Sequence, residues 1–193
     1  MHKEKYNLVI PTNISYKKIL DYGCGNGNLI DSNAISPSLY TGYEIDKSAY
    51  DYCVQKYPSY NFLYEDLHSV VYHKNGTKDF PSLNDSYDII FAYSVFTHTT
   101  YEYFCDCVDI FKNHLNTGGS IFVSMITFDN EIMLNYLKNK RIKKYGFCEI
   151  DFKDSYSYLI HNEEFVSIYD KEFLSKHGEF TSSNMPQDIL KIG

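Results

Sequence analysis

Three closely spaced glycines after a short apolar run constrain this chain more than any other feature. The run Ile19–Leu20 leads into Asp21, and the glycines follow at alternate positions, Gly23, Gly25 and Gly27. Glycine allows a tight turn and lets a backbone approach a ligand with no Cβ in the way. The order of strand, glycine turn and helix predicts a nucleotide-binding loop after a buried parallel strand.

A carboxylate ends the next predicted strand, which covers residues 39–44. Glu44 follows Gly25 by about 20 residues, the spacing at which folds of this kind hold a ribose diol. The glycine pattern is G-x-G-x-G, and Asn28 stands where a dinucleotide-binding loop has its last glycine or alanine. That departure argues against NAD or FAD.

Both stretches resemble the class I S-adenosylmethionine-dependent methyltransferases. The first motif of that family is similar to Leu20–Gly27, and the second is similar to Gly42–Asp46. Ser94–His98 and the pair Gly118–Gly119 resemble its later motifs, so the resemblance extends over residues 18–126. It implies an α/β, Rossmann-like, doubly wound fold with a mostly parallel seven-stranded sheet and an antiparallel last strand.

The alternation of apolar strands and helical segments supports this fold. Strands are expected at about 18–22, 39–44, 61–64, 87–93 and 120–126, with a closing antiparallel pair at about 179–183 and 187–192. Helices are expected at about 27–34, 48–57, 101–115, 129–144 and 170–177. Ser48 is expected to be the N-cap of the second of these helices.

The expected organisation is a single domain over residues 1–193. A cofactor-binding core is predicted at about 18–128, and a closing helix and strands at about 170–193. Between them, at about 129–169, aromatic and polar residues alternate and predict a small aromatic-rich cap inserted after strand five.

Composition limits the partners that we expect. No apolar run approaches the roughly 18 residues of a membrane span, and no signal peptide is visible, so a cytoplasmic location without a membrane partner is expected. The net charge of −7 argues against nucleic acid as a partner, because nucleic-acid binders present a basic surface. The five cysteines are odd in number and lack a C-x-x-C pair, which indicates reduced thiols. A homodimer is compatible with this composition.

The resemblance implies S-adenosylmethionine as the cofactor and S-adenosylhomocysteine as the product. It assigns Glu44 to the ribose, Ile45 to packing on the adenine, and Asp66 to the adenine amino group. A surface aspartate that caps the next turn is the alternative for Asp66. The residues expected at the cofactor are Asp21, Gly23, Cys24, Gly25, Gly27, Asn28, Glu44, Ile45, Asp66, Leu67, Tyr93 and Ser94.

His98 follows the fourth predicted strand and is the candidate general base, since an imidazole accepts a proton near physiological pH. Capping of the next helix, or packing under the cofactor, is an equal alternative. Tyr158 and His161, in the predicted cap, are further candidates for contact with the acceptor, with pocket wall or surface as the alternative. No catalytic metal is expected, because Tyr93-Ser94 stands where metal-dependent relatives carry an aspartate.

The expected function is methyl transfer to an oxygen or nitrogen of a small molecule, such as a sugar or a cell-surface precursor. Two alternatives stay open. One is a cofactor-binding domain without catalysis that acts as a partner or regulatory subunit. The other is a nicotinamide-dependent oxidoreductase on a similar fold. The acceptor itself cannot be read from these residues, because fold resemblance does not fix it.

Overall fold

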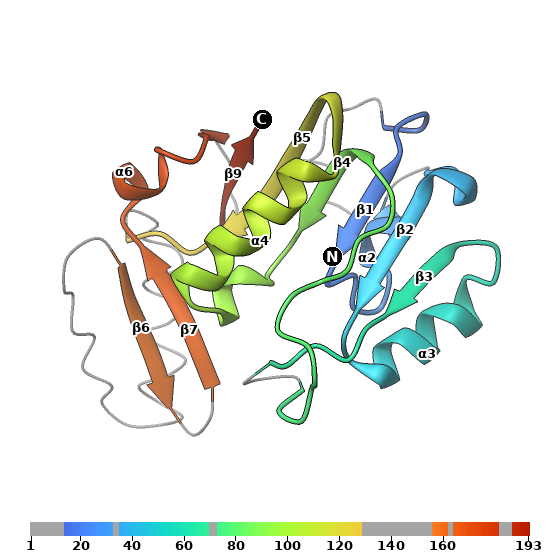
Figure 1. The fold of residues 1–193 in the computed structure, drawn as a ribbon, viewed down its shortest axis with the longest axis horizontal. Coiled ribbons are helices and arrows are strands. Elements are labelled where there is room, and N and C mark those ends of the chain that lie inside the picture. The colour runs from blue at the N-terminus through green and yellow to red at the C-terminus, as the bar shows by residue number, and fades with distance from the viewer. Residues whose placement is uncertain (1–13, 33–34, 70–72, 129–155, 162–163, 182–186) are drawn as a thin grey trace.

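A seven-stranded sheet forms the centre of the described part of the chain (Figure 1). The computed structural model describes residues 14–32, 35–69, 73–128, 156–161, 164–181 and 187–193, with only the backbone for 156–161 and 164–165. The strands of the sheet are β1 (Ile19–Tyr22), β2 (Tyr40–Glu44), β3 (Asn61–Tyr64), β4 (Tyr87–Ala92), β5 (Leu115–Met125), β8 (Glu179–Thr181) and β9 (Asp188–Ile192).

The strand order is β3-β2-β1-β4-β5-β9-β8. The first five strands in this order are parallel, whereas β9 is antiparallel to both of its neighbours, β5 and β8. The predicted fold, a mostly parallel sheet with an antiparallel last strand, is therefore confirmed. The direction in which the chain adds strands reverses between β1 and β4. In a parallel sheet, a ligand-binding crevice forms at such a point, at the carboxyl ends of the strands.

Helices cover both faces of the sheet. They are α2 (Asn28–Ser32), α3 (Lys47–Lys56), α4 (Tyr101–Asn113) and α6 (Lys171–Leu174), with the 3-10 helices η1 (Pro37–Leu39) and η2 (Phe96–His98). Alternate residues of a strand point to opposite faces. Leu20 accordingly packs in the core that α4 and α6 cover, while Ile19 packs in the core that α2 and α3 cover. None of the described helices is long and apolar enough to cross a membrane.

An antiparallel hairpin, β6 (Tyr156–His161) and β7 (Glu164–Tyr169), lies beside the main sheet (Figure 1). Two backbone hydrogen bonds join it to the segment that follows β5: Phe128 N–H donates to Tyr169 O at 2.9 Å, and Tyr169 N–H donates to Ile126 O at 3.0 Å. The hairpin lies within the segment 129–169 that the sequence predicts as a cap after strand five. The predicted helix at 129–144 lies outside the described residues.

Helix α3 begins at Lys47, and the prediction of Ser48 as its N-cap was wrong. Asp46 is the N-cap, because it lies two residues after the end of β2 and its side chain reaches the first free amides of the helix. Its Oδ1 accepts hydrogen bonds from Ser48 N–H at 2.8 Å and Ala49 N–H at 3.1 Å. The Ser48 hydroxyl instead donates to the same carboxylate oxygen at 2.6 Å.

We expect Asp46→Ala to lower the free energy of unfolding by about 1 kcal/mol, the usual cost of losing an N-cap. Urea unfolding followed by circular dichroism measures this change. Ser48→Ala is the matched control and should cost less than about 0.5 kcal/mol, because the cap itself remains. An equal loss in both variants would contradict the assignment of Asp46.

Candidate functional site

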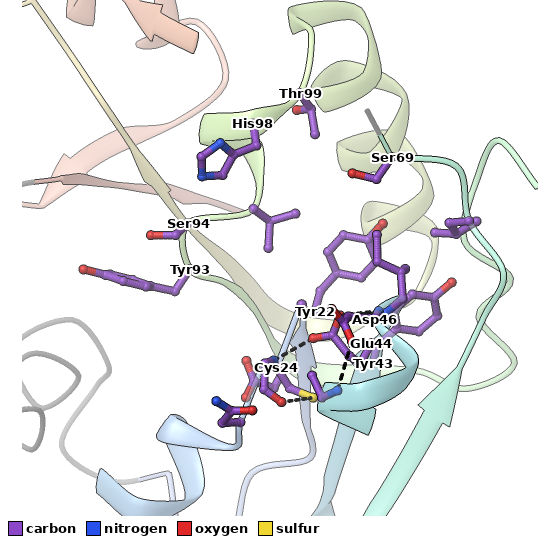
Figure 2. A pocket seen from close by; sticks show the side chains of 18 of the residues that line it. Tyr22, Cys24, Tyr43, Glu44, Asp46, Ser69, Tyr93, Ser94, His98 and Thr99 are labelled. Carbon is purple, nitrogen blue, oxygen red and sulfur yellow. Dashed lines mark hydrogen bonds between the residues drawn. The ribbon is translucent and has the colours of Figure 1, made fainter. Parts of the chain in front are cut away.

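A cavity of about 980 Å³ opens at the carboxyl ends of the parallel strands (Figure 2). Its wall includes Tyr22 from the end of β1, Glu44 from the end of β2, Leu67 after β3 and Tyr93 after β4. This volume is at the upper end of the range for small-molecule sites. The cavity is therefore large enough for a nucleotide-sized ligand.

The glycine loop is held against β2 by its backbone. Gly23 N–H and Cys24 N–H both donate to the Tyr43 carbonyl, at 2.9 and 3.1 Å. Gly23 and Gly25 have φ values of +71° and +53°, which side-chain-bearing residues rarely adopt. A Cβ on Gly23 would lie 2.4 Å from Val95 Cγ2, whereas a Cβ on Gly25 would meet nothing within 4 Å. Gly25 lines the cavity, so it presents open backbone to a ligand.

This contrast predicts different costs for two equivalent substitutions. Gly25→Ala should lower the free energy of unfolding by about 1 kcal/mol, because only the left-handed backbone opposes it. Gly23→Ala should cost about 1–3 kcal/mol more, because the new methyl group must displace Val95 in a packed region. Chemical denaturation of the two variants tests the difference. Equal stabilities would show that Val95 moves freely.

Glu44 is bonded to both sides of the crevice. Its Oε2 accepts a hydrogen bond from Gly25 N–H at 2.7 Å, and its Oε1 accepts from Ile45 N–H at 2.8 Å and Asp46 N–H at 2.9 Å. The residue is only 7% exposed, yet it lines the cavity. One carboxylate thus fixes the loop after β1 to the end of β2 and places negative charge in the wall.

Asp21, which lines the cavity, is buried and accepts a hydrogen bond from the Tyr40 hydroxyl at 2.8 Å. Burial raises the pKa of Asp21 to about 7, the Tyr40 hydrogen bond opposes the rise, and the neighbouring Glu44 charge adds to it. The carboxyl group therefore changes charge near neutral pH. A cation bound nearby would favour its ionised form.

Ser94 has a left-handed backbone with φ +58°, which is uncommon for a residue other than glycine. Its N–H donates to Ser124 Oγ at 2.7 Å, and its hydroxyl accepts a hydrogen bond from Gln187 Nε2 at 2.8 Å. Gln187 Oε1 in turn accepts from Ser124 Oγ at 2.6 Å. Residues of β5 and of the segment that enters β9 thus hold the cavity edge after β4. Sequence reasoning missed Ser124 and Gln187, because no local pattern brings three distant segments together.

His98 ends η2 and lines the cavity on the same side as Tyr93 and Ser94 (Figure 2). The hairpin supports this edge, because Ser167 Oγ of β7 donates a hydrogen bond to the carbonyl of Thr99. The hydroxyl of Thr99 is buried and has no hydrogen-bond partner among the described residues. A buried hydroxyl without a partner among the described residues thus lies next to His98 in the sequence.

Most residues that the sequence predicted for the cofactor lie around this cavity. Those in its wall are Asp21, Gly23, Cys24, Gly25, Asn28, Glu44, Ile45, Leu67, Tyr93 and Ser94. Gly27 and Asp66 are not among the described lining residues. Gly27 packs against the ring of Tyr57 at the end of α3, and Asp66 is bonded into the loop after β3.

Other predictions concern the acceptor and a metal. Tyr158 and His161 fall on β6, where the structure describes only the backbone. Sequence reasoning also missed several wall residues, chiefly Tyr43, Tyr52, His68, Ser69, Thr99, Thr100 and Tyr103. Their aromatic and polar types alone carry no signal of a site. Among the described residues, no group of three or more histidines, cysteines or acids could hold a metal ion.

Comparison with known families identifies the chain. A family model described as "Methyltransferase domain" matches residues 3–177. The chain belongs to this methyltransferase family. The family predicted from the glycine loop and the spaced acid is therefore confirmed.

Solved structures similar to this methyltransferase have the same fold. DesVI from Streptomyces venezuelae aligns with a TM-score of 0.60 and 11% identity, covering 99% of this chain and 89% of that protein. An S-adenosylmethionine-dependent methyltransferase from Clostridium acetobutylicum aligns with a TM-score of 0.56 and 12% identity, covering 91% and 83%. Magnesium protoporphyrin IX methyltransferase from Synechocystis, solved with bound S-adenosylhomocysteine, aligns with a TM-score of 0.55 and 16% identity, covering 93% and 74%. The chain thus has the class I fold of S-adenosylmethionine-dependent methyltransferases.

A curated relative matches part of the chain. The tRNA U34 carboxymethyltransferase of Campylobacter hominis is 28% identical over 130 residues, which are 66% of this chain and 42% of that protein. The match therefore spans less than half the length of this relative.

Proposed function

We propose that this methyltransferase transfers a methyl group from S-adenosylmethionine to an oxygen or nitrogen of a small molecule in the cytoplasm. One observation carries the proposal: the buried Glu44 carboxylate and the open backbone of Gly25 face the same cavity, 2.7 Å apart through a hydrogen bond. A carboxylate at this place suits a ribose diol. Backbone without a Cβ suits close approach by the methionine end.

Each residue of the wall has a role in this proposal. Glu44 binds the ribose hydroxyls, and Asp21 faces the positively charged end of the cofactor. Ile45 and Leu67 pack on the adenine. When bound, S-adenosylmethionine supplies a methyl group that its sulfonium already activates, so the protein need only orient the acceptor, exclude water and accept a proton. His98 is the residue that we propose accepts this proton.

The acceptor is a small molecule in this proposal, and a sugar or cell-surface precursor stays an expectation. The similar proteins act on unlike acceptors, since their names specify a porphyrin, a glycopeptide nitrogen and a tRNA uridine. Fold similarity therefore does not select one. The aromatic hairpin after β5 lies next to η2 and is the proposed source of acceptor contacts.

Calorimetric titration with S-adenosylhomocysteine tests the cofactor. We expect micromolar binding to the wild type and about tenfold weaker binding to Gly25→Ala, whose methyl group enters the cavity and would cost about 1.4 kcal/mol. NADH should not bind. Absence of S-adenosylhomocysteine binding, or tighter binding of NADH, would overturn the proposal and favour an oxidoreductase.

A screen of small amines and alcohols with methyl-labelled S-adenosylmethionine tests the transfer. With the first acceptor found, His98→Gln separates the two roles of this side chain. A lower kcat with unchanged affinity for S-adenosylhomocysteine supports a general base. Equal loss of kcat and of affinity would show that His98 packs against the cofactor instead.

A further inference from the structure

The loop after β3 is held by two acids at its start. We call residues 66–69 and 73–78 the β3 loop. Before it, Glu65 accepts hydrogen bonds from the Tyr43 hydroxyl, the Lys78 ammonium and Ser82 N–H, the last at 2.8 Å. Although burial opposes the change, Lys78, Ser82 and Tyr43 lower the pKa of Glu65 to about 2. The two ends of the loop are thereby fixed to the sheet.

Asp66 directs its oxygens into the same loop. Its Oδ2 accepts a hydrogen bond from Thr77 Oγ1 at 2.7 Å, and its Oδ1 lies 2.5 Å from His73 Nε2. Its backbone carbonyl accepts from Thr77 N–H at 2.9 Å and Lys78 N–H at 3.0 Å. All of these partners lie on the returning half of the β3 loop, and none of them lines the cavity.

The outgoing half of the loop does line the cavity. Its residues Leu67, His68 and Ser69 are part of the wall, and Ser69 lies across the cavity from Ser94 in Figure 2. The returning half holds them in place, since His68 N–H donates to the Lys78 carbonyl at 2.9 Å. Ser69 and His73 exchange two backbone hydrogen bonds, of 2.9 and 3.0 Å.

Gly76 shows how closely the halves pack. A Cβ on this glycine would lie 2.2 Å from the carbonyl carbon of Leu67 and 2.3 Å from its oxygen. Any side chain at this position must therefore push Leu67 away from the returning half. Gly76 is itself outside the cavity wall, so a substitution there reports on the position of the loop alone.

We propose that Asp66 is a positioning residue for the cofactor: it holds Leu67, His68 and Ser69 against the adenine without contacting the adenine amino group. This inference rests on the proposed use of S-adenosylmethionine. It reverses the role that the family resemblance assigns to Asp66. The Asp66 carboxylate holds the β3 loop through Thr77 and His73, and the loop in turn contacts the ligand.

Two ligands separate the two roles. S-adenosylhomocysteine carries the adenine amino group, and S-inosylhomocysteine carries an oxygen there, so a direct contact affects only the first. Calorimetry with wild type, Asp66→Ala, Thr77→Val and Gly76→Ala gives the dissociation constants for both. If the loop is in place about one tenth of the time without Asp66, both ligands should bind Asp66→Ala about tenfold more weakly.

The expected pattern is an equal loss for both ligands in all three variants, with Asp66→Asn restoring part of the affinity because its amide oxygen still accepts from Thr77. Hydrogen exchange should be faster at the amides of Thr77 and Lys78 in Asp66→Ala without ligand. A loss confined to S-adenosylhomocysteine, with unchanged exchange, would overturn the inference and show direct contact. Failure of the wild type to bind S-adenosylhomocysteine would instead overturn the proposed function.

Discussion

Glu44→Ala is expected to weaken S-adenosylhomocysteine binding by about 100-fold, because it removes a charged hydrogen-bond acceptor worth about 1.5–3 kcal/mol. The same change leaves Gly25 N–H, Ile45 N–H and Asp46 N–H without their shared acceptor. We therefore expect the free energy of unfolding to fall by about 3 kcal/mol. Calorimetric titration and urea unfolding measure the two losses separately.

Glu44→Gln is the matched variant. Its amide oxygen can still accept from Ile45 and Asp46, but its amide nitrogen would face the N–H of Gly25. It should therefore retain more stability than Glu44→Ala while still binding the ligand weakly. Asp51→Ala, an exposed acid on α3, should change neither quantity by more than about 0.5 kcal/mol. Unchanged affinity in Glu44→Ala would contradict the ribose contact.

Cofactor affinity is expected to rise about tenfold between pH 6 and pH 8 as Asp21 loses its proton. The pKa of this buried carboxyl is about 7 without ligand. A bound cation favours the ionised form, so binding releases a proton below pH 7 and each pH unit is worth up to about 1.4 kcal/mol. Titrations with S-adenosylmethionine at pH 6, 7 and 8 measure the slope.

Asp21→Asn is the control, since its amide oxygen still accepts from Tyr40 and carries no titrating proton. Its affinity should be lower and nearly independent of pH in this range. A wild-type slope that persists in Asp21→Asn would assign the titration to another group in the wall.

The same carboxyl gives a stability change of known sign. Asp21 ionises near pH 4 in the unfolded chain and near pH 7 in the folded one. Between these values the folded chain keeps a proton that the unfolded chain has lost. The free energy of unfolding is therefore highest, as far as this group is concerned, below about pH 4. It falls by about 4 kcal/mol as the pH rises to 7. Asp21→Asn should not lose it.

The sequence predicted the parts of the site that depend on neighbours along the chain. The glycine turn, the strands before it and after it, and the acid at Glu44 each follow from a local pattern of residue types. Because parallel strands place their carboxyl ends at one edge, these segments had to converge. In the structure, residues near the glycine loop, Glu44 and Ser94 line one cavity.

Other features depend on contacts between distant segments, which a local pattern does not contain. The left-handed Ser94 is held by Gln187, 93 residues further along the chain. The orientation of the Asp66 side chain depends on His73 and Thr77, on the returning half of the β3 loop. The residues next to Asp66 in the sequence do not specify where that half lies. The choice of Asp46 over Ser48 as N-cap depended on where β2 ends, a difference of two residues that sequence patterns do not resolve.

The position of β9 bears on how the protein is made. This strand lies between β5 and β8 in the sheet, yet the ribosome delivers it after both. Until it inserts, two strand edges expose unpaired backbone, the kind of surface that chaperones shield from aggregation. A nascent chain that ends before Gln187 already has its glycine loop and Glu44 but lacks the side chain that fixes Ser94. Competence to bind the cofactor should therefore arise late in synthesis.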